Sequence, residues 1–573
     1  MLFTVLGLAA YLRFAGIATS GIRFDDESWY ASDARLWHRC IRAAAEPGVL
    51  AAIAAGDKDG LKPRLEKFGI DFNDRYQKPS QGYTLLGAMV MFAAGDRPEA
   101  LNILNAIFGT LAVLLIFLLA RLWLGTSLGL VASYLLAVSP YHLFYCRSAL
   151  ADATAGCFVL AGTFFWTLAF RRMSRRPWAS LFAGIAFGWG ITCHYRIGYI
   201  PMVIVLTELV WLRNVGPKVG EDFRGMSVFR RAAWLFAGAL ISVGLLEGVF
   251  LMAGTAARMT DGYFPIQSYV GSLFSCLGRV FEHAGVDQRS FPQIGAMWTY
   301  GEYFIHRQGW AFLVLVAMGA LVTLSVRSAA VIGLVLVATT FLLLACQRYV
   351  VARALSPMVP YICILAACGL AAIIQTARFS ERRSMVMLAT CTVLSAFPAF
   401  AQSLDLVWWK SDLPTAAAAM ESLTEGTVAV PLNSRKYTLY MENNRSRVTA
   451  VTGNTSRPPN ALDIEGFRDQ GVRYLVVDPQ PWHFRGAPGG EHILAWWLAL
   501  DDLLRGQANL VDRFSHVEGA EWSFLAEGWG GRFASDMAAA HGGQIRIYDI
   551  SNHTEGDEAA QSPSRGVALM LRR

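Results

Sequence analysis

Three consecutive carboxylates, Asp25, Asp26 and Glu27, stand just after an apolar stretch at the start of the chain. Carboxylates crowded in this way raise one another's pKa, so one of them could act as a general base or ligate a metal ion. The same pattern is also typical of a solvated loop start, or of a helix N-terminus with acidic residues in its first turn. The triplet alone leaves these interpretations open.

Basic and aromatic residues in two further segments could contribute to the same chemistry. Lys78 follows Gln77 and precedes Tyr83 by five positions. A lysine close to a lipid headgroup usually contacts the lipid, and it could also bind a lipid phosphate. Arg147 and Asp152 follow Ser139-Pro140 in a short hairpin. Here the simpler roles are an N-cap for Asp152 and a snorkelling contact for Arg147.

Two later turns carry a histidine and a pair of arginines. His194-Tyr195-Arg196 lies between two apolar runs, and a lone histidine of this kind is more often structural than catalytic. Gln347-Arg348-Tyr349 is followed by Arg353, and these two arginines could hold a phosphate or anchor a helix end. Together the five segments predict a surface that suits an anionic lipid headgroup.

The composition identifies the class of protein that carries these segments. Of the 573 residues, 54% are apolar and 16% are charged, whereas soluble domains carry about 25% charged residues. The mean hydropathy is +0.38. Disorder, a coiled coil and a nucleic-acid-binding domain are excluded, and a polytopic membrane protein is predicted. The nine cysteines lie mostly in apolar runs, which argues against a disulfide scaffold.

Apolar runs of about 17 to 25 residues, the length that a bilayer requires, predict about eleven membrane-spanning helices. The first begins almost at Met1 and is expected to be an uncleaved span, because no basic segment precedes it. The predicted ranges are 2–19, 98–120, 126–140, 149–170, 178–195, 197–213, 232–254, 309–326, 329–346, 357–376 and 384–402.

The distribution of basic residues predicts the orientation of these spans. Lysines and arginines gather in the loops after the second, fourth, sixth, eighth and tenth spans, and basic loops favour the cytoplasmic side. The net charge of +7 reflects this orientation. The loops 20–97 and 255–308 and the segment after 402 are therefore expected outside. Within the first loop, the apolar stretch Tyr83 to Ala94 is too short to span and predicts an interfacial helix.

The chain is thus predicted to consist of a transmembrane module, residues 1–402, and a small soluble α/β domain, residues 403–573. Short apolar runs predict buried strands at 427–432 and 472–477, and an alternating pattern predicts another at 544–550, with a helical stretch at 493–504 between them. The domain has no nucleophile triad, zinc-ligand spacing or phosphate loop. We expect it to bind the acceptor or a partner, or to be structural.

The order of these motifs resembles that of the polyprenyl-phosphate-sugar-dependent glycosyltransferases of the GT-C fold, in particular the bacterial group related to protein O-mannosyltransferases and the lipid A aminoarabinose transferase. Asp26-Glu27-Ser28-Trp29-Tyr30-Ala31 is similar to the family's Asp-Glu-x-x-Tyr-Ala stretch. Lys78-Pro79, Ser139-Pro140 with Arg147 and Asp152, and Arg348-Tyr349 with two later prolines resemble three further motifs. The resemblance covers residues 1–215 and 345–375.

The resemblance implies a role for each candidate residue. Asp26 would be the general base, with Glu27 aligning it or the acceptor, and Asp152 would orient the donor or a divalent metal ion. The residues implied to bind the donor phosphate, and to stabilise the leaving polyprenyl phosphate, are Lys78, Arg147, Arg348 and Tyr349. Those implied to contact the substrate are Tyr83, His194 and Tyr195.

The chain departs from the family pattern at four places. His194 stands where a lysine is common, and Gln77 stands where some members have an acid. Asp25 is an additional carboxylate and could itself be the base. The spacing from Arg348 to Pro357 is longer than usual. No cofactor is implied with certainty, and a divalent metal ion remains open.

The sequence therefore predicts an inverting transferase that moves a hexosyl or pentosyl group from a polyprenyl-phosphate donor, outside a bacterial inner membrane, to an acceptor glycan, lipid or protein. Membrane lipid is an expected partner and nucleic acid is not. The first alternative is a transporter or flippase for a lipid-linked sugar, but charges inside the predicted spans are few, mainly Arg13, Glu208 and Glu247. The second is a scaffold, in which alanine variants of the acidic triplet would be silent.

Overall fold

The computed structural model divides the chain into two compact units. The first comprises Met1–Ala18, Trp29–Arg348 and Arg353–Val407, and the second comprises Thr19–Ser28, Tyr349–Ala352 and Trp408–Arg573. The structure describes residues 1–22, 25–70, 80–171, 177–209, 228–260, 268–275, 294–326, 329–345, 352–376, 380–408, 411, 413–423, 426–431, 435–441, 445–451, 457–478, 490–515 and 544–551.

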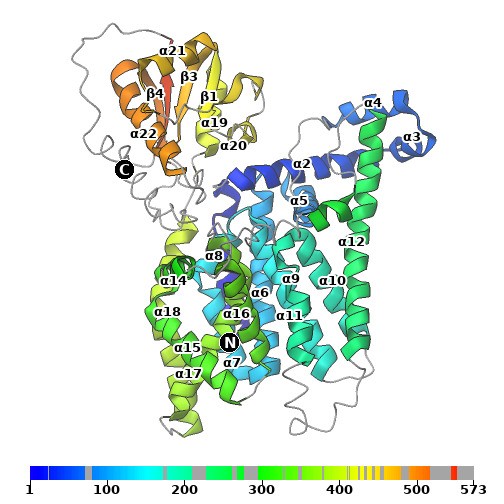
Figure 1. Cartoon of the computed structure of the whole chain (residues 1–573), viewed down its shortest axis with the longest axis vertical. Coiled ribbons are helices and arrows are strands. Elements are labelled where there is room, and N and C mark those ends of the chain that lie inside the picture. Colours follow the sequence, from blue (N-terminus) through cyan, green and yellow to red (C-terminus); the bar gives the residue numbers. More distant parts are fainter. Residues whose placement is uncertain are drawn as a thin grey trace. The chain divides into compact units, whose positions relative to one another are not determined.

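The first unit consists of helices (Figure 1). Those of its first half are α1 (Leu2–Phe14), α2 (Asp25–Ala44), α3 (Val49–Ala55), α4 (Lys58–Glu66), α5 (Gln81–Ala94), α6 (Ala100–Leu124), α7 (Thr126–Ala137), α8 (Pro140–Cys146), α9 (Ala151–Arg171), α10 (Pro177–Cys193) and α11 (Ile200–Thr207). Those of its second half are α12 (Val228–Met259), α14 (Ile294–Gln308), α15 (Trp310–Val326), α16 (Val331–Ala345), α17 (Val359–Thr376) and α18 (Glu381–Trp408).

Each of the eleven predicted spans overlaps a helix, but their number is not confirmed. Within the described ranges, five helices are long and apolar enough to cross a membrane: Ala100–Leu124, Ala151–Ala169, Val228–Met259, Arg353–Thr376 and Glu381–Val407. The pair α7 and α8, bent by 61°, would make a sixth if it is one span. The others are shorter than the run that predicted them. The 13 residues of α1, for example, would extend only about 20 Å.

Close backbone contact joins α10 to α12 in the membrane-type bundle. A Cβ atom added at Gly184 would meet the carbonyl of Leu235, and one added at Gly238 would meet the carbonyl of Leu181. Small residues at such an interface let two apolar helices approach, because lipid offers no hydrophobic driving force of its own. This contact holds α12 against the helix that leads into the His194 turn.

The loop 20–97 is largely helical where the structure describes it, which the sequence predicted only for its last stretch. In α2, Tyr30, Ala34 and Trp37 recur at helical spacing and are buried. Figure 1 shows α2 running crosswise to the bundle helices, with α3 and α4 beside one end of α12. The stretch predicted as an interfacial helix is α5, so its helical state is confirmed, whereas its place at an interface stays a prediction.

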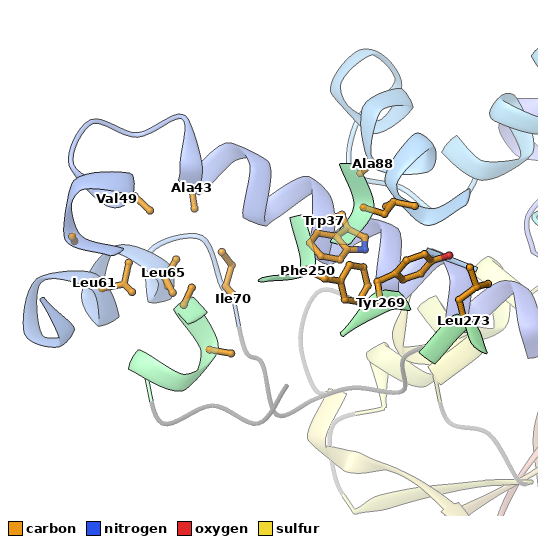
Figure 2. Close-up of a cluster of buried hydrophobic side chains, with 14 residues drawn as sticks. Trp37, Ala43, Val49, Leu61, Leu65, Ile70, Ala88, Phe250, Tyr269 and Leu273 are labelled. Carbon is orange, nitrogen blue, oxygen red and sulfur yellow. The ribbon is translucent and has the colours of Figure 1, made fainter. Parts of the chain in front are cut away.

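An apolar cluster fastens α2 to the bundle (Figure 2). The ring of Trp37 lies 5.3 Å from that of Phe250 on α12, and the Phe250 ring lies 5.2 Å from that of Tyr269. The cluster continues through α3 and α4 with Val49, Leu61 and other buried side chains. Burying an aromatic or leucine side chain contributes about 1.5–3 kcal/mol. The cluster therefore holds the polar, surface-type helices of this loop in one place.

The second unit contains a five-stranded sheet in the order β2-β1-β3-β5-β4 (Figure 1). Its strands are β1 (Thr427–Pro431), β2 (Val448–Val451), β3 (Val472–Val477), β4 (Asn509–Ser515) and β5 (Gln544–Asp549). The first three are parallel, with Val428 opposite Val448, and β5 is antiparallel to β3 and β4, with Leu475 opposite Tyr548. Its helices are α19 (Leu413–Ser422), α20 (Arg435–Thr438), α21 (Ala461–Asp469) and α22 (Gly490–Gln507).

The core of this unit joins helices to the sheet. Ile464 and Phe467 of α21, with Trp496 and Trp497 of α22, are buried in one cluster with side chains of the sheet, including Leu475. The three predicted strands are observed as β1, β3 and β5, and the predicted helical stretch lies within α22. The sequence missed β2 and β4. Whether this unit is an external soluble domain with the predicted bounds stays a prediction.

Candidate functional site

The acidic triplet opens a helix. Since α2 begins at Asp25, Asp26 and Glu27 lie in its first turn, where the helix dipole favours negative charge. Both are buried, Glu27 completely. The interpretation as a solvated loop start is therefore wrong, and that of acids in a first helical turn is correct. A buried carboxylate is costly unless it is paired or hydrogen-bonded. The predicted catalytic roles of these two acids stay predictions. The side chain of Asp25 lies outside the described residues.

Asp152 and His194 form a pair inside the first unit. Asp152 lies in the first turn of α9 rather than at its N-cap. His194 is the N-cap of the short 3-10 helix Tyr195–Ile197, and its Nδ1 accepts the backbone N–H of Arg196 at 3.3 Å. An accepting Nδ1 places the ring proton of the neutral imidazole on Nε2. Nε2 lies 3.6 Å from Oδ1 of Asp152, within ion-pair distance when the imidazole is protonated.

These two residues line a small pocket that is partly open to its surroundings. Its wall carries the charged residue Arg196 in addition to the pair. Nη1 of Arg196 is buried and has no hydrogen-bond partner among the described residues. The rest of the wall is mostly apolar, and its lining residues are Ile197, Tyr199, Thr340, Leu343, Leu344, Ala354, Pro357 and Met358. A buried guanidinium nitrogen without a partner beside an apolar wall suits an anionic group on an apolar chain.

Arg147 is buried and hydrogen-bonded to main-chain carbonyls, so a snorkelling role is wrong. Its Nη1 donates to the carbonyls of Leu12, Arg13 and Ala15 at 2.9–3.0 Å, at the end of α1. Its Nη2 donates to the carbonyl of Val407 on α18 at 2.9 Å. The last carbonyls of a helix need such donors, and a cation there interacts favourably with the helix dipole. The structure thus shows a helix-capping role, and phosphate binding by Arg147 stays a prediction.

The segment predicted as a hairpin between the third and fourth spans is the helix α8. Ser139 caps it by accepting the N–H of His142 at 3.2 Å, and Pro140 occupies its first position. Arg13 of α1 donates to the carbonyls of Leu136 and Ala137 at 3.2 Å, where α7 ends. A buried arginine therefore satisfies the backbone at the bend, which is how a broken helix is tolerated inside an apolar bundle.

Tyr83 is completely buried and belongs to a network that holds three helices together. Its hydroxyl accepts from Nδ2 of Asn105 on α6 at 3.0 Å, and its ring meets that of Tyr30 edge-on. Asn105 also accepts from Thr154 on α9 at 2.6 Å, two residues beyond Asp152. Tyr83 thus supports the start of α9, and its predicted substrate contact stays a prediction.

The remaining predicted residues divide into one that is described and three that are not. The ring of Tyr195 stacks on that of His194 at 5.6 Å, next to the pocket. Lys78, Arg348 and Tyr349 lie outside the described residues, as does Gln77. Their predicted contacts with the donor phosphate stay predictions.

The described residues do not include a cluster that could hold a metal ion. Across the described part of the chain, no group of three or more His, Cys, Asp and Glu side chains has the proximity that a metal ion requires. Asp152 and His194 are two donors that face each other. Two donors do not form a metal site by themselves.

The sequence analysis predicted no role for Arg196 or for Gln81. Nε2 of Gln81 on α5 donates to Oδ2 of Asp33 at 3.1 Å, and Oε1 of Gln81 accepts from Nε1 of Trp37 at 2.7 Å. Asp33 and Trp37 are one turn apart on α2, so a helical prediction for that stretch would have placed them on one face. No signal in the sequence marked Nη1 of Arg196 as unpartnered.

The chain is similar to known proteins in part of its sequence and in its fold. Residues 79–220, which include Asp152, His194 and Arg196, match the family model of dolichyl-phosphate-mannose-protein mannosyltransferases. ArnT from Cupriavidus metallidurans in the apo state is similar in structure, with a TM-score of 0.52, 12% identity, and coverage of 96% of this chain and 97% of that chain. No curated protein matches the chain significantly.

A second solved structure extends the likeness. The archaeal oligosaccharyltransferase AglB from Archaeoglobus fulgidus, in complex with an inhibitory peptide and a dolichol-phosphate, has a TM-score of 0.51 at 13% identity. The match covers 91% of this chain and 74% of that chain. At such identities the likeness shows the fold. The chain is therefore a membrane-type helical protein of the GT-C fold, and its predicted resemblance to the polyprenyl-phosphate-sugar-dependent glycosyltransferases of that fold is confirmed.

Proposed function

We propose that the protein transfers a sugar from a polyprenyl-phosphate donor to an acceptor hydroxyl, with inversion at the anomeric carbon. The observation that carries this proposal is the pocket of Asp152, His194 and Arg196, whose wall joins three ionisable side chains to an apolar surface. A lipid phosphate has the same two parts, an anion and a long apolar chain. The family model that matches this region, and the dolichol-phosphate named for AglB, support that choice of ligand.

In the proposed reaction, a carboxylate oxygen of Asp26 takes the proton of the acceptor hydroxyl. The acceptor oxygen then bonds to the anomeric carbon while the bond from that carbon to the phosphate oxygen breaks. The bonding electron pair leaves with the polyprenyl phosphate, which gains one negative charge. Placed cations stabilise such a developing anion strongly in a site of low dielectric constant. We assign this role to Arg196, with His194 donating a hydrogen bond, and to Lys78 and Arg348 as the resemblance implies. The resemblance implies the same role for Arg147, whose Nη1 and Nη2 donate to main-chain carbonyls in the structure.

The remaining parts of the proposal follow from the sequence. The active site is assigned to the external face of a bacterial inner membrane, as the distribution of basic residues predicts. The donor sugar is a hexose or a pentose, and the acceptor is a glycan, a lipid or a protein. The α/β unit is assigned to acceptor or partner recognition.

The test is a transfer assay with purified protein in lipid nanodiscs. A panel of polyprenyl-phosphate sugars is supplied with candidate acceptors, and released polyprenyl phosphate is measured with and without a chelator. We expect release by the wild type with one donor, and a loss of about 10²- to 10⁴-fold in Asp26→Asn, as for removal of a general base. The chelator arm decides the metal question by its effect on that rate.

Asp25→Asn is the matched control, since it removes a carboxylate of the same triplet. Full activity in Asp25→Asn beside an inactive Asp26→Asn supports Asp26 as the base. Full activity in both variants overturns the assignment of the triplet. Absence of release with every donor, together with movement of lipid headgroups across the bilayer, would favour the flippase instead.

A further inference from the structure

The acidic residues are carried by a segment of the second unit, not of the first. The segment Thr19–Ser28 includes Asp26 and Glu27, and it is grouped with the α/β part of the chain. Two hydrogen bonds from main-chain atoms of the segment hold it within this unit. The N–H of Ile22 donates to the hydroxyl of Tyr440 at 2.9 Å, and the carbonyl of Ser20 accepts the N–H of Ser411 at 2.9 Å.

Close packing accompanies these hydrogen bonds. Ser20 and Ile22 are completely buried. Gly21 between them has a φ of +66°, and a Cβ atom there would lie 3.0 Å from Cβ of Ser411 and 3.5 Å from Cδ of Pro414. Both the backbone conformation and the lack of space favour glycine at this position. The segment is thus packed closely against the start of α19.

Tyr440 is in turn tied to the middle of the sheet. Its N–H donates to the carbonyl of Tyr437 at 3.0 Å. The buried hydroxyl of Tyr437 donates to Oδ2 of Asp478 at 2.5 Å, and Asp478 directly follows β3, the central strand. Tyr437 and Asp478 are both buried, so these contacts are shielded from water. A continuous series of hydrogen bonds therefore joins the central strand to Ile22, four residues before Asp26.

We propose that Tyr440 is a positioning residue for the acidic first turn of α2, so that the α/β unit holds the general base in place. This inference rests on the proposed function, because it gives Asp26 a catalytic role. It assigns to the α/β unit a task besides recognition of a partner. The physical reason is that catalytic groups tolerate little displacement, since a shift of about 1 Å can cost about 10²-fold in rate.

The test compares Tyr440→Phe, which keeps the ring and removes only the hydroxyl, with Tyr548→Phe. Tyr548 lies in the same unit, and its hydroxyl donates to the buried Asp501 at 2.8 Å, away from the segment. For Tyr440→Phe we expect kcat to fall about 10- to 100-fold, the donor KM to stay within about twofold, and amide exchange of residues 19–28 to rise. For Tyr548→Phe we expect a lower Tm with kcat unchanged.

Gly21→Ala gives a second, independent perturbation of the same segment and should reproduce the loss of kcat. Unchanged amide exchange in Tyr440→Phe overturns the anchor, and raised exchange with unchanged kcat overturns the positioning role. A wild type that transfers no sugar from any donor removes the proposed function and with it the catalytic role of Tyr440. The exchange measurement would still report whether the segment is anchored, so the two failures are distinguishable.

Discussion

Nε2 of His194 lies 3.6 Å from Oδ1 of Asp152, and both side chains are buried at the edge of an otherwise apolar pocket. The two residues come from different helices, since Asp152 opens α9 and His194 begins the turn after α10. Substitution of either residue removes this contact from the other. The pocket therefore responds to substitution at either residue.

We predict that His194→Gln weakens binding of the donor phosphate about 10-fold, as expected for loss of a charge-assisted hydrogen bond. His194→Lys should bind within about threefold of the wild type, because a lysine, the residue that is common here in the family pattern, can also donate a hydrogen bond to the phosphate. Titration with polyprenyl phosphate in nanodiscs measures both affinities. His38→Gln is the matched control, since His38 lies on α2 and does not line the pocket. Equal affinities for all three variants would contradict the role of His194.

Arg196→Gln should lose donor binding without losing stability. The Nη1 atom of Arg196 has no partner among the described residues, so its removal leaves no described acceptor unsatisfied. The expected cost in affinity is about 10- to 100-fold, the range for a hydrogen bond to a charged group. The same titration measures it, and Tm is recorded in parallel. A large fall in Tm with unchanged affinity would show that Arg196 is structural.

Arg147→Gln should behave in the opposite way. Removing this guanidinium leaves the carbonyls of Leu12, Arg13, Ala15 and Val407 without the donor that they share. Each buried carbonyl left unsatisfied costs about 1–3 kcal/mol. We expect a strong loss of Tm or of folded protein on size-exclusion chromatography. A variant that keeps the wild-type Tm and loses only donor affinity would instead support phosphate binding by Arg147.

Gly238→Ala should destabilise the helix bundle, whereas Gly244→Ala on the same helix should not. A Cβ atom at Gly238 would press on the carbonyl of Leu181, while one at Gly244 would meet nothing within 4 Å. Overpacking of this kind typically costs about 1–3 kcal/mol. Thermal unfolding in detergent compares the two variants directly. Equal Tm values would indicate that α10 and α12 can move apart to accept the added methyl group without loss of stability.

Acidification should loosen the contact between α2 and α5 through His38. Burial lowers the pKa of His38; Asp96 opposes this shift, and Arg42, Arg39 and Arg35 add to it. A lowered pKa in the folded state means that the neutral ring is favoured there. Its contribution to stability is therefore complete above the unfolded pKa of about 6.5 and is lost as the pH falls from that value through the folded pKa.

The measurement is Tm against pH for the wild type and His38→Phe. The ring of His38 packs edge-on against that of Phe92 at 4.7 Å, so phenylalanine keeps the aromatic contact and removes the titrating group. We expect the wild type to lose Tm below pH 6.5 more steeply than the variant does. Parallel curves would assign the acid sensitivity to other groups.

The features that could be predicted from the sequence are those that depend on residues close together in the chain. Long apolar runs mark the eleven predicted spans, each of which overlaps a helix, since burial in lipid or in the core selects the same residue types throughout a helix. Strands β1 and β3 were predicted because they are buried and therefore apolar, and β5 was predicted because its apolar and polar residues alternate. The edge strands β2 and β4 were missed, because β2 has only four residues and Asp512 and Arg513 interrupt the apolar pattern of β4.

The partners of the polar residues were decided by the tertiary structure alone. The resemblance implies phosphate binding by Arg147, and no sequence pattern indicated the contacts that the structure shows, which lie 132–135 residues away at the end of α1 and 260 residues away on α18. Ile22 meets Tyr440 across 418 residues. A sequence shows which side chains can donate or accept, whereas folding determines which of them share a buried space. For this protein the sequence by itself determined the membrane class, the central strands and the family resemblance; only the fold decided which charges cap helices and which face a pocket.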